Sequence, residues 1–289
     1  MKPSSAFNWL FFIYGVILLT TNSLPAHEST HPSNASAQYL GNEAVLITTD
    51  QHKLLFDPFF HKTFGIYQAV PDSIRQSMMD GKAPYNNVDF MFISHAHDDH
   101  FSAQDVLTYL TQHKHVKLFA PRQAVNQLTS LKPDKTIKDR LFSISLLPET
   151  IAWKKTIDNT LIEAVRIPHA GWPARADVEN LVFRVTDNSS DNKKVTVMHM
   201  GDADPNPKHF LTHKNHWQKR KTSTAFPPYW FMLSREGQYI LNNIINSHHN
   251  VGIHVPVKVP ENLKQSGYDY FSKPGEQQEI HFDSQKKPE

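Results

Sequence analysis

Histidine and aspartate side chains are concentrated in one short stretch of the chain, "FISHAHDDHF", residues 92–101. His95 and His97 are two positions apart, which places both imidazoles on one side of an extended segment, and Asp99 and His100 follow directly. The chain contains no cysteine, so a metal site must use nitrogen and oxygen ligands, which suit Zn²⁺, with Mn²⁺ or Fe²⁺ as alternatives. The stretch therefore predicts a site for one or two divalent cations rather than a solvated polar loop.

Three later segments also carry a histidine or aspartate after a strand-like run. They are "RIPHAG", "HMGDAD" and "GIHVPV", which contain His169, Asp202 and His254. Together with the first stretch, they resemble in order the ligand motifs of the metallo-β-lactamase superfamily, which begin with His-x-His-x-Asp-His. The resemblance spans about residues 38–257, and four ordered motifs are far more specific than one.

The resemblance implies a dinuclear hydrolytic site. It implies seven ligands for two ions per chain, zinc by default: His95, His97 and His169 for one ion, Asp99, His100 and His254 for the other, and Asp202 between them. Two such ions share a water, lower its pKa towards neutrality and present a hydroxide to a carbonyl or phosphorus centre. Asp99 and Asp202 are then also the expected catalytic residues, with Asp202 positioning the hydroxide.

The residue at position 202 bears on the branch of the family. β-Lactamases of the family commonly carry cysteine or serine at this point, so Asp202 makes a β-lactam hydrolase the less favoured alternative. The pattern is similar to the branch with L-ascorbate-6-phosphate lactonase and N-acyl-phosphatidylethanolamine phospholipase D. We therefore expect cleavage of an ester-like bond in a phosphodiester, lactone or related carbonyl substrate. A non-catalytic periplasmic metal-binding protein is the alternative from another class.

Strand-like and helix-like runs alternate along the chain and must position these residues. "VDFMFI" leads directly into the histidine stretch, and further on we expect a helix over residues 235–249 and a strand over residues 251–257. No internal repeat or linker divides the chain after its amino end, which favours one domain. The resemblance implies an α+β fold, a four-layer αβ/βα sandwich of two mixed β-sheets flanked by helices.

Two polar residues outside the ligand motifs have competing interpretations. Asp57, in "LLFDPF", resembles an acidic residue that supports the site in this family by orienting a ligating imidazole. An aspartate that caps a turn before proline is an equally good interpretation. His199, three residues before Asp202, is more typical of a hydrogen-bonded core histidine than of a ligand.

Two segments are candidates for the substrate wall. Trp172, Tyr229 and Trp230 could line an apolar pocket near the ions, and the basic stretch 213–221 could contact a phosphate or carboxylate group. A solvated basic helix face, with its histidines exposed, is the favoured interpretation of residues 213–221. Net charge is only +2, from 30 basic and 28 acidic residues, so we expect a small-molecule or lipid-like substrate and no nucleic acid. The sequence carries no signal of an oligomeric state.

The amino end has the layout of a secretory signal. A lysine precedes an apolar run that is shorter than the roughly 20 residues of a spanning helix, and small residues end at Ala26. We expect a signal peptide over residues 1–26, a linker over 27–37 and the hydrolase domain over 38–289. The protein is then periplasmic or secreted, with no stable membrane span after cleavage; an uncleaved anchor is the weaker alternative.

Overall fold

The computed structural model describes residues 35–190 and 193–280, which contain two seven-stranded β-sheets. The first sheet has the strand order β14-β1-β2-β3-β4-β5-β6, and the second has the order β13-β12-β11-β10-β9-β8-β7. Both sheets combine parallel and antiparallel neighbours. The predicted pair of mixed sheets is therefore confirmed.

The first sheet brings the ends of β3 and β4 together. Its strands are β1 (Ala35–Gly41), β2 (Ala44–Thr48), β3 (Lys53–Phe56), β4 (Phe90–Phe92), β5 (Lys117–Pro121), β6 (Leu141–Ile144) and β14 (Gln277–Ile280). β3, β4, β5 and β6 are parallel, so their carboxyl ends lie at one edge. Asp57 and the histidine stretch leave the sheet at this edge.

The second sheet aligns three strands that precede predicted ligands. Its strands are β7 (Trp153–Ile157), β8 (Thr160–Arg166), β9 (Leu181–Ser190), β10 (Lys193–His199), β11 (Thr222–Phe226), β12 (Ser247–Gly252) and β13 (Asp269–Tyr270). β9 is antiparallel to both β8 and β10, while β10, β11 and β12 are parallel. β8, β10 and β12 therefore run in one direction, and His169, Asp202 and His254 follow their carboxyl ends.

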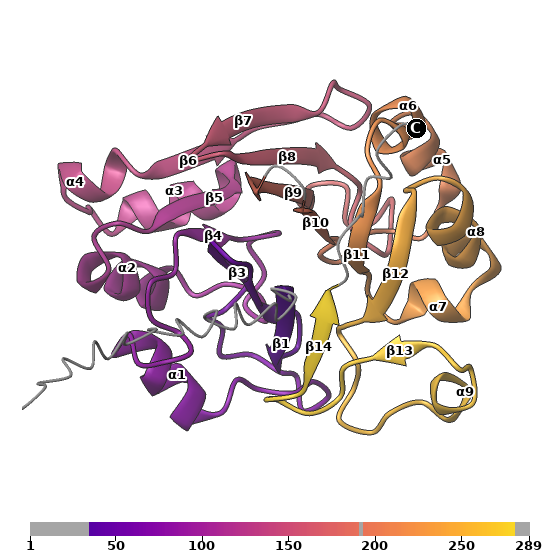
Figure 1. The fold of residues 1–289 in the computed structure, drawn as a ribbon, viewed down its shortest axis with the longest axis horizontal. Coiled ribbons are helices and arrows are strands. Elements are labelled where there is room, and N and C mark those ends of the chain that lie inside the picture. Colours follow the sequence, from indigo (N-terminus) through magenta and orange to yellow (C-terminus); the bar gives the residue numbers. More distant parts are fainter. Residues whose placement is uncertain (1–34, 191–192, 281–289) are drawn as a thin grey trace, which may run out of the picture. The chain divides into compact units, whose positions relative to one another are not determined.

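Helices cover the outer face of each sheet (Figure 1). On the first sheet lie α1 (Asp72–Met79), α2 (Ala103–Gln112), α3 (Arg122–Ser130) and α4 (Lys135–Lys138). On the second lie α5 (Pro207–Leu211), α6 (Lys214–Gln218), α7 (Trp230–Leu233), α8 (Arg235–Asn243) and α9 (Glu261–Lys264). The inner faces share one apolar core, in which the Phe92 and Phe183 rings of the two sheets lie 5.2 Å apart. The four-layer sandwich is as expected.

The helix expected over residues 235–249 is wrong in its second half. α8 ends at Asn243, and Asn246 has a positive φ of 56°, which stops the helix. His248 and His249 then lie on β12, which pairs in parallel with β11 on one side and β13 on the other. Ladder hydrogen bonds on both sides of the strand outweigh the local helix preference of this segment.

The amino-terminal predictions lie outside the described residues. This holds for the signal peptide over residues 1–26 and for all but the last three residues of the linker over 27–37. Among the helices of residues 35–190 and 193–280, none is long and apolar enough to cross a membrane.

Candidate metal centre

The loop after β4 folds back on itself to collect four polar side chains. The backbone N–H groups of His100 and Phe101 both donate to the carbonyl of His97, at 3.0 and 2.9 Å. This tight turn brings Asp99 and His100 back towards His95, and the side chain of Asn42 donates to the Asp99 carbonyl at 2.9 Å. The loop is thereby fixed by backbone contacts that leave its imidazoles and carboxylate free to point inward.

The end of β10 approaches this loop so closely that a glycine is required. Gly201 has a φ of 52°, and a Cβ there would lie 2.4 Å from Asn180 Oδ1 and 2.7 Å from Ser94 Cβ. The same Asn180 oxygen accepts the backbone N–H of Asp202 at 3.0 Å, and the Leu181 N–H donates to the Ser94 carbonyl at 2.9 Å. The second sheet is thus locked to the histidine loop of the first beside Asp202.

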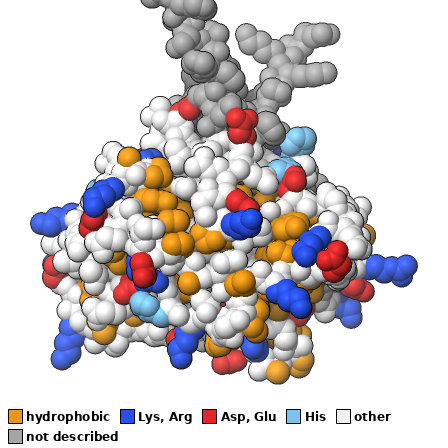
Figure 2. All heavy atoms as spheres, turned by 90° about the horizontal axis from the view of Figure 1, so that it is seen from below, with side chains coloured by type: hydrophobic (Ala, Val, Ile, Leu, Met, Phe, Trp, Pro, Cys, Tyr) orange, Lys and Arg blue, Asp and Glu red, His pale blue; other side chains and the backbone are white. Residues whose placement is uncertain are grey.

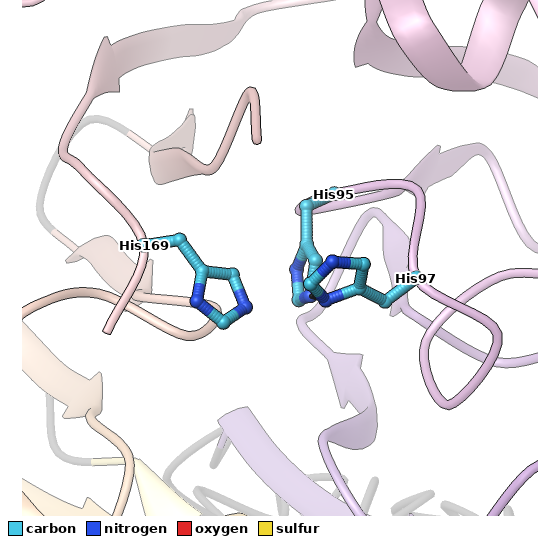
Figure 3. Close-up of side chains that lie close together, drawn as sticks. All are labelled: His95, His97 and His169. Atoms are coloured by element: carbon cyan, nitrogen blue, oxygen red, sulfur yellow. Dashed lines mark hydrogen bonds between the residues drawn. The ribbon is translucent and has the colours of Figure 1, made fainter. Parts of the chain in front are cut away.

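The predicted ligands come together in two groups. The first group is His95, His97 and His169, and the second is Asp99, His100 and His254; within each, one ligand atom per residue lies within 4.8 Å of the others. Figure 3 shows the first group: His95 and His97 leave one loop, and His169 points towards them from the opposite side. His254 is held by its N–H, which donates to the Asn42 carbonyl at 3.0 Å, in a left-handed conformation with a φ of 59°.

The Asp202 carboxylate lies between the two groups. Its Oδ2 is 3.2 Å from His169 Nε2 and 3.9 Å from His95 Nε2. Its Oδ1 is 3.1 Å from His254 Nε2 and 3.5 Å from His100 Nε2. Each oxygen therefore faces a different group of imidazoles, which is the geometry of a bridging ligand.

Buried polar atoms at this site lack hydrogen-bond partners, which tests whether the donor set fits metal ions. They are the Nε2 atoms of His100, His169 and His254 and the Oδ1 of Asp202. Each buried polar atom without a hydrogen-bond partner costs about 1–3 kcal/mol of stability. Four such atoms in one place therefore indicate that a ligand binds there. Nitrogen and carboxylate oxygen atoms at these separations suit divalent cations, and the residues present fit two of them.

The electrostatics of the site also favour bound cations. Burial and the neighbouring His100 hold the pKa of His95 well below its usual range, so His95 is in the neutral form that binds metal. Burial would lower the pKa of His100, yet Asp202 and the hydrogen-bonded Asp57 raise it to about 10. Burial likewise opposes ionisation of Asp202, but His254 and His100 hold its pKa well below the usual range. The carboxylates thus create a field that attracts positive charge.

Asp57 contacts the site through His100. Its Oδ1 accepts the Ser94 N–H at 2.7 Å, and its Oδ2 lies 2.5 Å from Ser94 Oγ and 3.1 Å from His100 Nδ1. Because Nδ1 is engaged in this way, the opposite ring nitrogen of His100 points at Asp202. The structure therefore favours the imidazole-orienting interpretation of Asp57 over the turn-capping one.

Glu43, which the sequence analysis did not single out, lies beneath the same imidazole. It is fully buried in the turn between β1 and β2, 3.7 Å from His100 Nδ1 and 3.8 Å from His199 Nε2. Burial and the charge of Asp202 raise its pKa well above the usual value. His199 donates to the Glu43 carbonyl at 2.9 Å and stacks on Phe56, so it is the core histidine that was expected. A glutamate in a hairpin turn carries no sequence signal that it will be buried beside a ligand histidine.

Two cavities are lined by both Asp202 and His254, and only one of the three aromatic candidates borders them. The first, about 460 Å³, is lined by Phe64, Ile66, Tyr67, Ala96, His97, Asp98, Asp99, Arg175, Asp202 and His254. Trp230 borders the neighbouring cavity, with its ring 5.2 Å from that of His254. Trp172 is 40% exposed, contacts His209 and borders neither cavity, and Tyr229 packs behind Trp230. The expectation that Trp172 and Tyr229 line the pocket is not met.

The basic stretch 213–221 also lies away from these cavities. It contains α6, in which Trp217 is fully buried, and His213 is only 5% exposed. His216 and Arg220 face Glu163 on the outer side of the second sheet. The expectation of solvated histidines here is wrong, because the amphipathic turn packs its imidazoles inward.

The fold and the clusters of histidine and aspartate between its two sheets define a protein of the metallo-β-lactamase fold. Residues 36–216 match the family described as the Beta-lactamase superfamily domain, and the chain belongs to this family.

Comparison with solved structures supports the same fold. The metallo hydrolase Igni18 from the hyperthermophilic archaeon Ignicoccus hospitalis is 15% identical, with a TM-score of 0.58, over 86% of this chain and 100% of that one. The metallo-beta-lactamase fold protein YhfI from Bacillus subtilis is also 15% identical, with a TM-score of 0.55, over 86% and 99% of the two chains. A comparison with curated proteins found no match.

Proposed function

We propose that this protein is an exported dinuclear metal hydrolase that cleaves an ester-like bond, with zinc as the default metal and Mn²⁺ or Fe²⁺ as alternatives. The observation that carries the proposal is the position of Asp202, whose two oxygens face different imidazole groups at 3.1–3.9 Å. A single-ion site would need only one of these groups. The family to which the chain belongs supports the same proposal.

Seven residues would hold the two ions. They are His95, His97 and His169 on one side, Asp99, His100 and His254 on the other, and Asp202 between the two. Divalent ions held there supply Lewis acidity, which lowers the pKa of water and polarises a carbonyl or phosphoryl bond.

The protein's own residues prepare this centre and leave part of it open to the cavities. Asp57 fixes the ring of His100, and the Asn42 side chain and carbonyl hold the loops of Asp99 and His254. Asp99 and Asp202 border the first cavity, so a substrate can reach the inner edge of the cluster. This access favours catalysis over metal storage, since storage does not require an open face.

The proposed substrate is a small or lipid-like molecule. Figure 2 shows one face of the molecule, on which hydrophobic side chains and charged side chains of both signs are interspersed. On this face such mixing leaves no continuous positive surface for a phosphate backbone, and the net charge of the chain is only +2. The proposal that the enzyme is exported rests on the amino-terminal sequence pattern, and release of the mature chain by signal cleavage tests it.

Metal content and turnover of the mature protein test the proposal. Protein purified without chelator should hold about two metal equivalents per chain and hydrolyse at least one member of a panel of phosphodiesters, lactones and carboxylic esters. Asp202→Asn, which removes the bridging charge, should lower turnover by about a thousandfold or more and reduce metal content. Asp139→Asn, at a surface carboxylate that pairs with Lys135, is the control and should leave both unchanged.

Two results would contradict the proposal. Near-zero metal that does not rise on adding zinc or manganese would remove the ligand assignment. Two bound ions with no turnover across the panel would leave a metal-binding protein without hydrolase activity.

A further inference from the structure

The cavities at the candidate metal centre contain a single cationic side chain. Arg175 borders both cavities, together with Tyr67, Asp202 and His254. Among the described residues that line them there is no lysine and no second arginine. A substrate that enters either cavity therefore meets the Arg175 guanidinium.

This guanidinium has no partner within the described part of the chain. Other arginines are engaged: Arg166 donates to carbonyls of its neighbours, and Arg184 pairs with Glu163. The Arg175 side chain makes no ion pair or hydrogen bond with residues 35–190 or 193–280, although it lies beside a carboxylate-rich centre. An arginine that borders a cavity and has no ion-pair or hydrogen-bond partner can bind an incoming carboxylate or phosphate through bidentate hydrogen bonds.

The loop that carries Arg175 is held at both ends. At the start, the Ala170 N–H donates to the Asp202 carbonyl at 2.7 Å. At the end, Arg166 Nη2 donates to the Ala176 carbonyl at 3.1 Å. Between them Gly171 has a φ of 89°, and the Arg175 side chain folds back across it, with Cδ 3.6 Å from the position a Cβ would occupy. The backbone of the loop is therefore anchored at both ends, while the Arg175 side chain that it carries is exposed beside the cavities.

A second wall of the first cavity, the one that Phe64 and Ile66 line, is apolar and exposed. Phe64 is 64% exposed and Ile66 is 49% exposed, which is unusual for large hydrophobic side chains. Their segment is tied to the strand end that carries His254, because the Val257 N–H donates to the Ile66 carbonyl at 2.8 Å. Tyr67 continues the wall, with its ring 4.0 Å from that of His254. Apolar surface on a substrate would gain free energy by covering these side chains.

We propose that Arg175 binds a negatively charged group of the substrate that is separate from the scissile bond, while Phe64 and Ile66 cover an apolar part of the same molecule. The substrate class is thus an amphipathic ester that bears a carboxylate or phosphate group. This inference rests on the proposed function, because the cavity is a substrate site only if the cluster is catalytic. Arg175 is a specificity residue here and has no role in bond cleavage.

Matched esters test the inference by kinetics. The substrates are 4-nitrophenyl esters of glutarate, 3-phosphonopropionate and valerate, so that a carboxylate, a phosphonate and a neutral end are compared on short acyl chains. Arg175→Gln should raise KM for the two anionic esters at least about tenfold and leave the valerate ester nearly unchanged, with kcat unaffected. The anionic ester whose KM rises more in Arg175→Gln identifies the charged group of the natural substrate. Lys135→Gln, at an exposed surface pair, is the matched charge control and should change neither.

The apolar wall is tested with the same reporter group. Phe64→Ser should raise KM for a 4-nitrophenyl octanoate relative to the acetate by about tenfold, because the longer chain loses its cover. An unchanged octanoate-to-acetate ratio would overturn the apolar half of the inference. An unchanged anionic-to-neutral ratio in Arg175→Gln, with activity retained, would overturn the anionic half while leaving the hydrolase proposal intact.

Direct binding separates this inference from the proposed function. Wild-type protein and Arg175→Gln, both with their metal content intact, are titrated calorimetrically with hexylphosphonate and with heptanoate. Binding to the wild type that weakens at least about tenfold in Arg175→Gln would support the anion site even if no ester were hydrolysed. Equal affinity of the two proteins for both probes, or no binding to either, would overturn it.

Discussion

Buried carboxylates occur in two regions of this protein, and the charge around them is balanced in different ways. On the outer face of the second sheet, Glu163 is 2% exposed and pairs with Arg184 Nε at 2.9 Å, Arg220 Nη1 at 3.0 Å and Lys154 Nζ at 3.3 Å. The Arg184 guanidinium also donates to the carbonyls of His216 and Trp217. This cluster, Glu163 with its three cations, is complete within the chain.

The carboxylates between the two sheets have no such partners. Glu43, Asp57, Asp99 and Asp202 are all buried, and within the described residues their ion pairs are with histidines alone, never with lysine or arginine. A histidine balances a buried carboxylate only while it carries a proton, and a histidine that binds metal is neutral, so cations from solution would complete the balance here. Complete ion pairing with lysine and arginine therefore indicates a structural charge cluster. Ligand atoms without such partners indicate a site for cations.

Substituting Glu163 should produce the larger effect on stability. Glu163→Gln leaves two buried or half-buried guanidinium groups without their counter-charge, so we expect a loss of about 3–5 kcal/mol in the free energy of unfolding. Denaturant unfolding measures this loss, and metal content should stay at the wild-type value. A loss below about 1 kcal/mol, as expected for an exposed pair, would remove the distinction between the clusters.

Substituting Asp57 should give the opposite pattern. In Asp57→Asn the new amide would donate to His100 Nδ1, which moves the ring proton to the nitrogen that faces Asp202. We therefore expect metal affinity or turnover to fall about 10- to 100-fold, with far less destabilisation than in Glu163→Gln. Metal titration beside denaturant unfolding of both variants gives the test. Equal metal affinity in Asp57→Asn and wild type would show that Asp57 has only a structural role.

The smallest of the three effects should come from His216, which makes the free energy of unfolding depend on pH. Burial and the neighbouring Arg184 lower the pKa of His216 to about 4, against opposition from Glu163, while Lys154 and His213 lower it further. Between pH 6.5 and about 4 the unfolded chain binds a proton that the folded protein excludes, so stability falls as pH is lowered through this window. His216→Asn should flatten that part of the curve in denaturant unfolding. A slope identical to the wild type would assign the dependence to other groups.

The seven proposed ligands could be identified from sequence because each lies in a short motif at a strand end. His95 to His100 form one motif, and the chemistry of each motif is readable without knowing the fold. The two mixed sheets likewise followed from the resemblance, because the resemblance implies the fold of the family whose ligand motifs the chain matches. For the ligand motifs, the local sequence pattern and the observed sheet topology therefore agree.

The surroundings of the site could not be predicted, because tertiary packing decides them. Glu43 and Arg175 lie in ordinary turns, and they reach the site only when the β1–β2 hairpin and the 170–178 loop pack beside it. Trp172 follows a ligand motif in sequence, yet its loop turns outward and leaves it 40% exposed. The histidines of residues 213–221 read as a hydrophilic surface, but the packing of α6 on the second sheet covers them.

The division of the ligands between the two sheets bears on how the protein persists once folded. His95, His97, Asp99 and His100 follow a strand of the first sheet, whereas His169 and His254 follow strands of the second, so each proposed ion joins both halves. Separation of the halves, a step in global opening, would then require release of two ions. Bound metal stabilises the folded state and should therefore slow the unfolding rate. For the exported enzyme proposed above, that slow opening would lengthen its lifetime among proteases.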